Sequence, residues 1–240
     1  MVFFDQVEEK KSPKRKKTMP PKYPQKAATG KKRMHRLTRL SIVTSRVLSL
    51  IFTPFYLPLV STTLLFFFSY LTLLHWQYKV FIFGMVYLFT IFLPTMLIHL
   101  YMRYQGWSIL KLISREGRMV PYVISISSYF FCFYLMKLFH FPHFLSIIIL
   151  AALFIQIVCA ITNIWFKIST HTAAIGGITG GLLAYAEIFA FNPLWWLCLC
   201  LLVGGLVGTG RMMLRQHSLH QVVYGFLVGA IVSFFVIITL

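Results

Sequence analysis

The sequence predicts an all-α fold, a polytopic bundle of about six or seven transmembrane helices, and three observations support this prediction. Hydrophobic residues make up 58% of the 240 residues and the mean hydropathy is +0.77, whereas soluble domains contain about 45–50% apolar residues. Apolar runs of about 20 residues recur along the chain, long enough to cross a hydrocarbon layer about 30 Å thick as helices. Acidic residues are nearly absent after position 9, where only Glu116 and Glu187 occur.

The first 36 residues form a basic segment that differs in composition from the rest of the chain. Of the 23 Lys and Arg residues, 14 lie between Lys10 and Arg46, so most of the net charge of +18 belongs to this part. Like charges repel one another, and four prolines between Pro13 and Pro24 oppose a long helix. We therefore expect residues 1–36 to be a disordered tail. No nucleic-acid partner is predicted, because no stacking aromatic residues or folded reading module accompany the charge.

Seven segments of the remaining region, residues 37–240, are predicted to span the membrane. They lie near residues 54–74, 80–101, 120–138, 144–165, 172–190, 194–210 and 222–240. Residues 37–53 place Arg39 and Arg46 among Leu and Ile, a pattern typical of an amphipathic helix at the membrane interface. Residues 37–240 are thus predicted to form one transmembrane domain.

The predicted connections differ between the two ends of the bundle. Those after the second, fourth and sixth spans carry most of the remaining polar residues, and the other three are short and apolar. With seven crossings the polar connections lie on the same side as the N-terminus, which the excess of Lys and Arg places in the cytoplasm. If residues 37–74 cross twice, the tail and the polar connections lie on opposite sides. We expect an integral, multi-pass protein of a bacterial inner membrane or a plasma membrane.

Three polar segments, residues 111–118, 167–171 and 210–221, occur in these connections. Together they supply two histidines, several cations and hydroxyl groups, a set suited to binding phosphate. Arg presents a planar fork of donors to phosphate oxygens, and the N–H groups at the start of a helix also bind anions. His217 and Gln221 are four residues apart, so on a helix the amide can orient the imidazole. One histidine can then attack phosphorus while the other protonates the leaving oxygen.

In order and spacing, the three segments resemble the three-part signature of the phosphatidic acid phosphatase type 2 superfamily of membrane lipid phosphatases. That signature reads K-x6-R-P, then P-S-G-H, then S-R-x5-H-x3-D. The matching residues are Lys111, Arg118, Ser169, His171, Arg211 and His217. The resemblance covers roughly residues 100–230, a lipid-phosphatase-like core, and implies phosphatase-type active-site loops on one membrane face.

The resemblance also implies a mechanism and a role for each residue. His217 would attack the phosphorus to form a phosphohistidine, His171 would protonate the departing oxygen, and water would hydrolyse the intermediate. The phosphoryl oxygens would be held by Lys111, Arg118, Ser169, Thr170 and Arg211. The family requires no metal, and no cofactor is expected. Its substrates imply that the partner of this chain is a membrane lipid phosphate or an isoprenoid diphosphate.

The sequence departs from the signature at several positions. The smaller departures are Pro121 displaced by two residues, Ile168 for Pro, Thr170 for Gly and Gly210 for Ser. The first motif is the weakest of the three, because basic residues are common at membrane interfaces and because Arg115 can take the place of Lys111.

The main departure is Gln221, which stands where the signature has Asp. An aspartate would stabilise the imidazolium that forms when His217 is the nucleophile, whereas an amide can only orient the ring. In the serine-protease template, exchanging the corresponding acid for an amide lowers turnover by about 10⁴. Two functions therefore stay open, a lipid phosphatase and a catalytically weak or inactive member that binds anionic lipid headgroups. A transporter is disfavoured, because the predicted spans contain almost no ionisable residues.

Small residues mark the fifth and sixth predicted spans. They are Gly176, Gly177, Gly180 and Gly181 in the fifth span and Gly204, Gly205 and Gly208 in the sixth. Because small residues let helix backbones approach closely, these two helices are predicted to pack against each other. Their packing would hold the segments that carry His171 and Arg211 close together. The sequence does not predict an oligomeric state.

Overall fold

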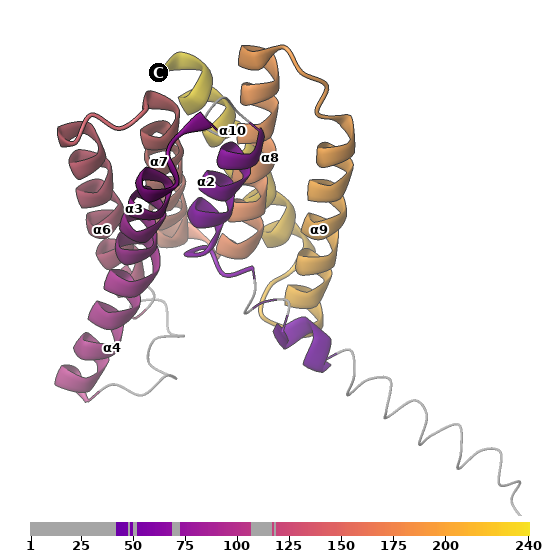
Figure 1. The fold of residues 1–240 in the computed structure, drawn as a ribbon. Coiled ribbons are helices and arrows are strands. Elements are labelled where there is room, and N and C mark those ends of the chain that lie inside the picture. Colours follow the sequence, from indigo (N-terminus) through magenta and orange to yellow (C-terminus); the bar gives the residue numbers. More distant parts are fainter. Residues whose placement is uncertain (1–41, 48, 50–51, 69–72, 107–116, 118) are drawn as a thin grey trace, which may run out of the picture. The chain divides into compact units, whose positions relative to one another are not determined.

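A computed structural model describes residues 42–47, 49, 52–68, 73–106, 117 and 119–240 of this protein (Figure 1). Residues 40–240 form one compact unit. The predicted tail, residues 1–36, lies outside the described residues, as do Lys111 and Arg118. The regular secondary structure of the described residues is entirely helical, so the predicted all-α fold is confirmed.

Six helical segments among the described residues are long and apolar enough to cross a membrane. The first combines α3 (Trp76–Tyr87), η2 (Leu88–Phe92) and α4 (Leu93–Gln105). The others are α6 (Met119–Leu138), α7 (His143–Trp165), α8 (Thr170–Phe189), α9 (Leu194–Met213) and α10 (Leu219–Thr239). Each corresponds to one predicted span, which confirms a multi-pass membrane protein.

The first predicted span, residues 54–74, takes a different form from the other six. The described part of its helix, α2 (Leu57–Phe68), has 12 residues and extends about 18 Å. A turn precedes it, in which the Tyr56 N–H donates to the Thr53 carbonyl at 3.0 Å. Pro54 lies in this turn and has no N–H to donate to a helix. The helix therefore begins at Leu57, three residues after the predicted start of the span, and residues 69–72 lie outside the described residues.

The chain before α3 nevertheless runs from one end of the bundle to the other. Residues 42–47 are helical, and the Ser45 hydroxyl lies 3.9 Å from the Met213 sulfur at the end of α9. Leu65 of α2 packs instead with Phe141 and Leu145, beside the connection between α6 and α7 at the opposite end. The loops before α8 and α10 thus lie at the same end as Ser45 (Figure 1). Which side of the membrane this end faces stays a prediction.

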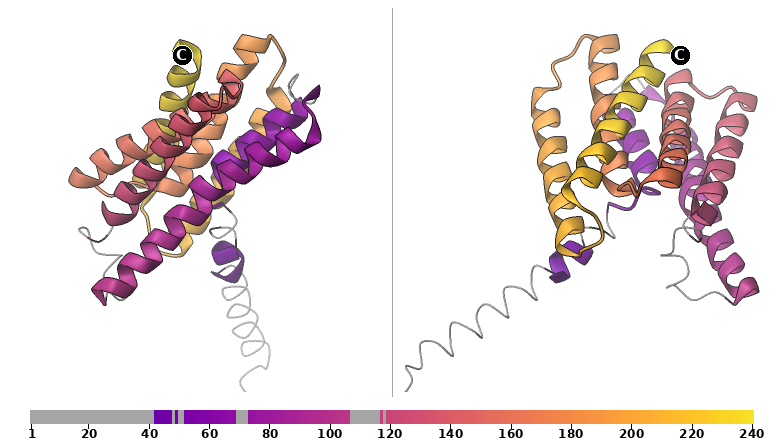
Figure 2. Two further views of the ribbon diagram at one scale, coloured as in Figure 1. Left: turned by 60° about the vertical axis from the view of Figure 1, so that its left-hand side comes forward. Right: turned by 180° about the vertical axis from the view of Figure 1, so that it is seen from behind.

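The helices α3, η2 and α4 form one continuous rod (Figure 2). The wide helical turn of η2 (Leu88–Phe92) has a local cause in Pro94, two residues further on. Proline cannot donate to the carbonyl four residues earlier, which here belongs to Thr90. A π-helical turn accommodates this missing bond without ending the helix. The sequence pattern predicted a span in this region but not its internal π-helical turn.

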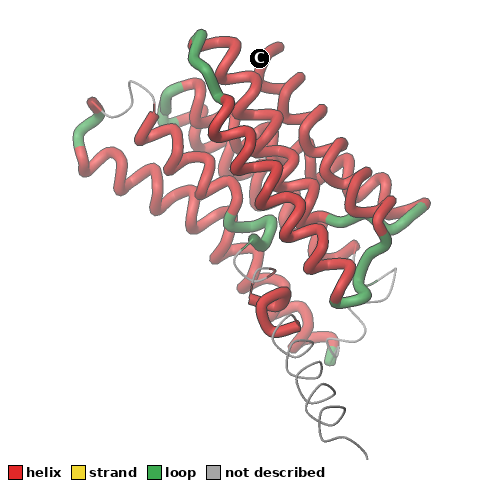
Figure 3. Tube along the Cα trace, turned by 90° about the vertical axis from the view of Figure 1, so that its right-hand side faces the viewer, coloured by secondary structure: helices red, strands yellow, loops and turns green. Residues whose placement is uncertain are grey.

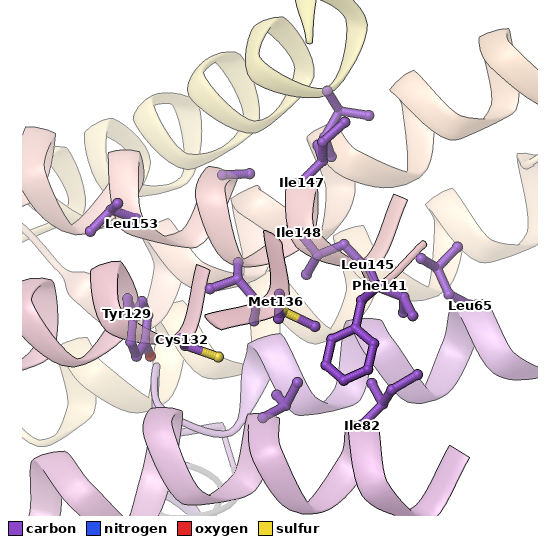
Figure 4. Close-up of a cluster of buried hydrophobic side chains, with 14 of the residues drawn as sticks. Leu65, Ile82, Tyr129, Cys132, Met136, Phe141, Leu145, Ile147, Ile148 and Leu153 are labelled. Atoms are coloured by element: carbon purple, nitrogen blue, oxygen red, sulfur yellow. The ribbon is translucent and has the colours of Figure 1, made fainter. Parts of the chain in front are cut away.

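The connections from α6 through α10 are short (Figure 3), and the largest buried cluster lies mainly between α3, α6 and α7. Figure 4 shows part of this cluster, including Ile82, Met136 and Leu145, which are completely buried. The outward faces carry many exposed apolar side chains, as expected for a protein surrounded by lipid. Trp76 and Trp195 are exposed near helix starts at one end, and Trp165 is exposed at a helix end at the other. Tryptophans in such positions are typical of the two membrane interfaces.

The glycine-rich helix α8 packs against α9, as predicted, and more extensively against α10. A Cβ atom on Gly176 would overlap the Phe226 carbonyl oxygen, and one on Gly229 would overlap the Ala173 carbonyl oxygen. Both helices therefore contribute small residues to the same interface. The predicted contact of α8 with α9 is confirmed, and the more extensive contact with α10 was not predicted because the prediction left out the glycines of α10, Gly225 and Gly229.

Candidate active site

The connections that precede α8 and α10 bring the second and third sequence motifs together. The Ser169 N–H donates to the Gln221 carbonyl at 3.3 Å, and the Lys167 ammonium donates to the Gln216 carbonyl. These two bonds join the loop before α8 to the loop and first turn of α10. The segments that carry His171 and His217 are therefore neighbours, although about 45 residues separate them in sequence.

The connection between α9 and α10 is a tight helix cap. The Arg215 N–H donates to the Met212 carbonyl at 2.9 Å, and the Gln216 N–H donates to the Arg211 carbonyl at 3.1 Å. This pair of bonds is the Schellman motif, which usually has glycine in the left-handed position. Here Arg215 occupies that position with φ 53°. The cap reverses the chain, so that His217 returns to the side chain of Arg211.

His217 contacts two polar side chains through its two ring nitrogens. Its Nδ1 lies 3.2 Å from the Gln221 Oε1, and its Nε2 lies 3.4 Å from the Arg211 Nη2. An amide oxygen only accepts and a guanidinium only donates. These partners assign the ring proton to Nδ1 and a lone pair to Nε2. The nitrogen that faces Arg211 is thus the one able to act as a nucleophile.

Gln221 is held in place by the start of its own helix. Its Oε1 also accepts the Ser218 N–H at 3.2 Å, and Ser218 and Gln221 form a capping box at the start of α10. The Gln221 Oε1 therefore accepts two hydrogen bonds, one from the Ser218 N–H and one from the His217 Nδ1–H. This arrangement fixes the orientation of His217 through backbone structure as well as through the side chain.

His171 is the second residue of α8 and lies near Arg211 and His217. Its Nδ1 and the Nε of Arg211 are buried and have no hydrogen-bond partner among the described residues. An unpaired buried polar atom costs about 1–3 kcal/mol, so a ligand that supplies an acceptor atom to the Arg211 Nε–H would recover that energy. Within the described part of the chain the one acidic residue is Glu187, close to the other end of α8. The site is therefore suited to an anion.

The start of α8 supplies further polar groups beside His171. Ser169 is the N-cap residue and is completely buried; its hydroxyl accepts the Thr172 N–H at 3.5 Å. The Ser169 hydroxyl therefore serves the helix, and its predicted role in binding phosphate stays a prediction. Thr170 is the first residue of the helix and is half-buried. The positive end of the helix dipole lies at these residues and favours an anion.

The first sequence motif is not placed by the structure. Lys111, Arg115 and Arg118 lie outside the described residues, and α6 begins directly after them at Met119. Their predicted contact with phosphate stays a prediction. Among the described residues, no group of three or more His, Cys, Asp or Glu side chains is placed to hold a metal ion.

Gly225 controls how closely α10 approaches the start of α8, which leads to a first testable prediction. A Cβ atom at this position would lie 2.5 Å from the Ser169 carbonyl oxygen and 2.6 Å from the Thr172 hydroxyl. Gly225→Ala is therefore expected to lower stability by about 1–3 kcal/mol through overpacking. It should also separate His217 from His171. Thermal unfolding in detergent measures the loss of stability.

Gly205→Ala is the matched control for this variant, because a Cβ atom at Gly205 on α9 would meet nothing within 4 Å. Alanine favours a helix over glycine by about 1 kcal/mol, so Gly205→Ala should keep or raise the unfolding temperature. Equal behaviour of Gly205→Ala and Gly225→Ala would contradict the proposed close contact.

Fold and site together define a polytopic helical membrane protein with two histidines and an arginine at one end of the bundle. The model of the PAP2 superfamily matches residues 165–240. This match confirms the resemblance seen in the sequence for α8, α9 and α10 and supports a phosphatase-type function. It covers the second and third motifs, and residues 111–118 lie outside it. No curated protein and no solved structure matches the chain.

Sequence reasoning did not identify several residues that shape this site. Lys167 joins the two loops, Gly225 allows the close helix approach, and Thr172 donates to the Ser169 carbonyl at 3.0 Å. Gly225 and Gly229 are four residues apart, a spacing that could have indicated a close helix contact. The contact of the His171 ring with the backbone of Ser49 has no signal in the sequence, because it depends on where the chain before α2 crosses the bundle.

Proposed function

We propose that this protein is a metal-independent phosphatase of a phosphorylated membrane lipid, acting through a phosphohistidine on His217. One observation carries the proposal: His217 holds its proton on Nδ1 through Gln221 and directs Nε2 toward Arg211, with His171 nearby. A nucleophile, an orienting partner, a cation and a second imidazole are the groups that phosphoryl transfer through histidine requires.

The proposed reaction has two steps. In the first, Nε2 of His217 attacks phosphorus, the bond to the lipid oxygen breaks, and His171 gives a proton to that oxygen. In the second, water attacks the phosphohistidine, His171 takes a proton from the water, and His217 is released with inorganic phosphate. The same group thus acts as general acid and then as general base.

Arg211 is placed to stabilise the negative charge of the transferred group. In the structure without ligand, its Nη2 lies against the nucleophilic nitrogen, and its Nε has no partner among the described residues. A phosphoryl group bound between Arg211 and His217 would accept bonds from the guanidinium. Preorganised donors of this kind typically contribute the largest single part of such catalysis.

An apolar cavity supports a lipid as the substrate. A cavity of about 360 Å³ lies in the bundle and is bordered by α2, α7 and α8. Thr170, Ala174 and Ile178 line it along one face of α8, beginning next to His171. Such a cavity is suited to a hydrocarbon chain whose phosphate lies at the end of α8. The membrane lipid phosphate and the isoprenoid diphosphate both have this general form.

Phosphate release by the purified protein tests the proposal. The protein in detergent, with a metal chelator present, is incubated with a panel of diacylglycerol phosphates, sphingoid phosphates and polyprenyl mono- and diphosphates. We expect release of inorganic phosphate from at least one of them. Release from none of the panel would contradict the phosphatase function.

The second candidate function is a protein that binds anionic lipid headgroups without turnover, and Gln221 is the observation that favours it. The variant Gln221→Glu separates the two functions, because glutamate has the same reach and is a usual partner in a capping box. We expect it to raise kcat about fivefold, since a hydrogen bond to a charged acceptor exceeds a neutral one by about 1 kcal/mol.

The measurement is kcat over a range of pH, so that a change in the protonation of His217 is separated from a change in the chemical step. Gln221→Leu serves as the control without an acceptor and should lose activity. If the wild type binds phosphorylated lipid without turnover and only Gln221→Glu releases phosphate, the binding function is supported. An unchanged rate in Gln221→Glu would contradict the role given to this residue.

A further inference from the structure

The chain that precedes α2 passes over the end of the bundle that carries the candidate site, and we call its described residues from Ser45 to Leu57 the strap. Ser45 is 4% exposed, because it packs on the last turns of α9. A Cβ atom added at Gly210 would lie 3.4 Å from the Ser45 Cβ, and the Ser45 hydroxyl lies 3.9 Å from the Met213 sulfur. The strap thus begins against the site end of α9 (Figure 1).

The strap then packs on α8 and α9 beyond the site. Phe52 contacts a buried cluster that contains Ile175 of α8 and Val207 of α9, and Leu57 belongs to the same cluster. Pro54 borders the cavity that also borders Thr170. These contacts, together with those of Ser45, fix the course of the strap across the start of α8.

Between these packing contacts the strap reaches His171. The His171 ring contacts the backbone carbonyl of Ser49, and its Nδ1 has no hydrogen-bond partner among the described residues. A carbonyl oxygen only accepts, so the ring nitrogen that serves this contact, Nε2, carries a proton. The same carbonyl accepts the Thr53 hydroxyl at 3.2 Å, which its second lone pair permits. The lone pair of neutral His171 is therefore on Nδ1.

An imidazole that transfers protons requires an acceptor on its far nitrogen, which fixes the tautomer and the orientation of the ring. For His217 this acceptor is the Gln221 amide. For His171 the Ser49 carbonyl is placed to serve in the same way. The strap lies outside residues 165–240, which match the superfamily model, so the second acceptor comes from a different part of the chain.

We propose that the strap is part of the active site and that the Ser49 carbonyl positions His171 for proton transfer. Ser49 is a positioning residue, because it acts through His171. Ser45 and Phe52 hold the strap on either side of it. This inference rests on the proposed phosphatase function, in which His171 is the general acid and base, and it gives the chain before α2 a role in that reaction.

The variant Ser45→Leu tests the role of the strap, because leucine is too large for the contact with Gly210 and Met213 and should displace the strap from α9. We expect kcat on a lipid phosphate to fall about tenfold or more, within the 10² to 10⁴-fold that a general acid contributes. On an aryl phosphate, whose leaving group needs no proton, the loss should be under about threefold. Val43→Leu is the matched control, because Val43 is 57% exposed on the same short helix; it should stay within about twofold of the wild type on both substrates.

The double variant Ser45→Leu/His171→Ala separates positioning from a general effect on the fold. If the strap acts through His171, the double variant should be as active as His171→Ala alone, because residues that act as a unit are not additive. A purely structural role predicts losses that multiply in the double variant and that are equal on the lipid and the aryl phosphate. Either of these results would overturn the proposal.

Cross-linking tests the strap contact without relying on a comparison of rates. The pair Ser45→Cys and Gly210→Cys is made with Cys198 and Cys200 changed to serine. The two Cβ positions are 3.4 Å apart, close to the separation of about 3.5–4.5 Å in disulfides, so mild oxidation should join them. Ser45→Cys with Gly205→Cys should stay reduced, because a Cβ atom at Gly205 meets nothing within 4 Å. A pair that does not join, or activity that is lost on oxidation and regained on reduction, would contradict a strap held in place during the reaction.

Nitrogen-15 spectra of the histidine-labelled protein keep this inference separate from the phosphatase function. The His171 signal, identified by its absence in His171→Ala, should show the proton on Nε2 in the wild type and a mixture of tautomers in Ser45→Leu. If no lipid is hydrolysed but the spectra and the cross-link are as expected, the phosphatase proposal fails and the contact of the strap with His171 stands. A proton on Nδ1 in the wild type would overturn that contact whatever the catalytic result.

Discussion

Replacing His217 with alanine is expected to lower kcat/KM for phosphate release by at least about 10³-fold, because the reaction then has no nucleophile on the protein. The structure gives a specific reason to choose this histidine. Its Nε2 faces Arg211 while its Nδ1 is held by Gln221. Steady-state phosphate release from the preferred lipid measures the effect.

His220→Ala is the control for this variant, because His220 lies in the first turn of the same helix and is exposed. Its activity should remain within about twofold of the wild type. Rapid quenching with labelled substrate should trap a phosphoenzyme in the wild type and in His220→Ala but not in His217→Ala. A phosphoenzyme that persists in His217→Ala would show that another residue is the nucleophile.

Replacing His171 with alanine is expected to lower kcat by about 10² to 10⁴-fold for a lipid alcohol as leaving group, the usual contribution of a general acid. The loss should be much smaller, under about tenfold, for an aryl phosphate, whose leaving group needs no proton. This comparison is sharper than the loss alone, because a variant that was only misfolded would lose activity on both substrates.

Stability provides the control for His171→Ala. The Nδ1 of His171 has no hydrogen-bond partner among the described residues, so its removal breaks no bond at that atom. Because the ring also contacts the backbone of Ser49, the variant should lose no more stability than one hydrogen bond contributes, about 0.5–1.5 kcal/mol. Equal losses of activity on the lipid and the aryl phosphate would contradict the assignment of His171 as the general acid.

The long helices could be predicted from the sequence because membrane burial imposes a simple length requirement. Each of the six apolar runs after residue 75 forms a helical segment close to its predicted bounds. Residues 54–74 fulfilled the same requirement of composition but contain a turn before α2. Hydropathy reports whether a segment avoids water, and it does not report whether protein neighbours allow the helix to be interrupted.

Part of the site could also be predicted from the sequence. The spacing of four residues between His217 and Gln221 indicated an orienting contact, and the structure has it at 3.2 Å. The capping box that holds Gln221 follows from the same local helix start. The partner of the α8 glycines was not predictable in this way, since several helices carry small residues and only packing decides which pair meets.

The sequence by itself predicted the helical membrane class of the protein and the polar residues at one end of the bundle, because hydropathy and the spacing within each motif, such as that from Arg211 to His217, are properties of short segments. Only the tertiary structure decided that α8 packs on α10, that Lys167 joins the two site loops, and that the chain before α2 reaches His171. These features join residues that are far apart in the chain. They depend on side-chain volumes at helix contacts, which no local pattern specifies.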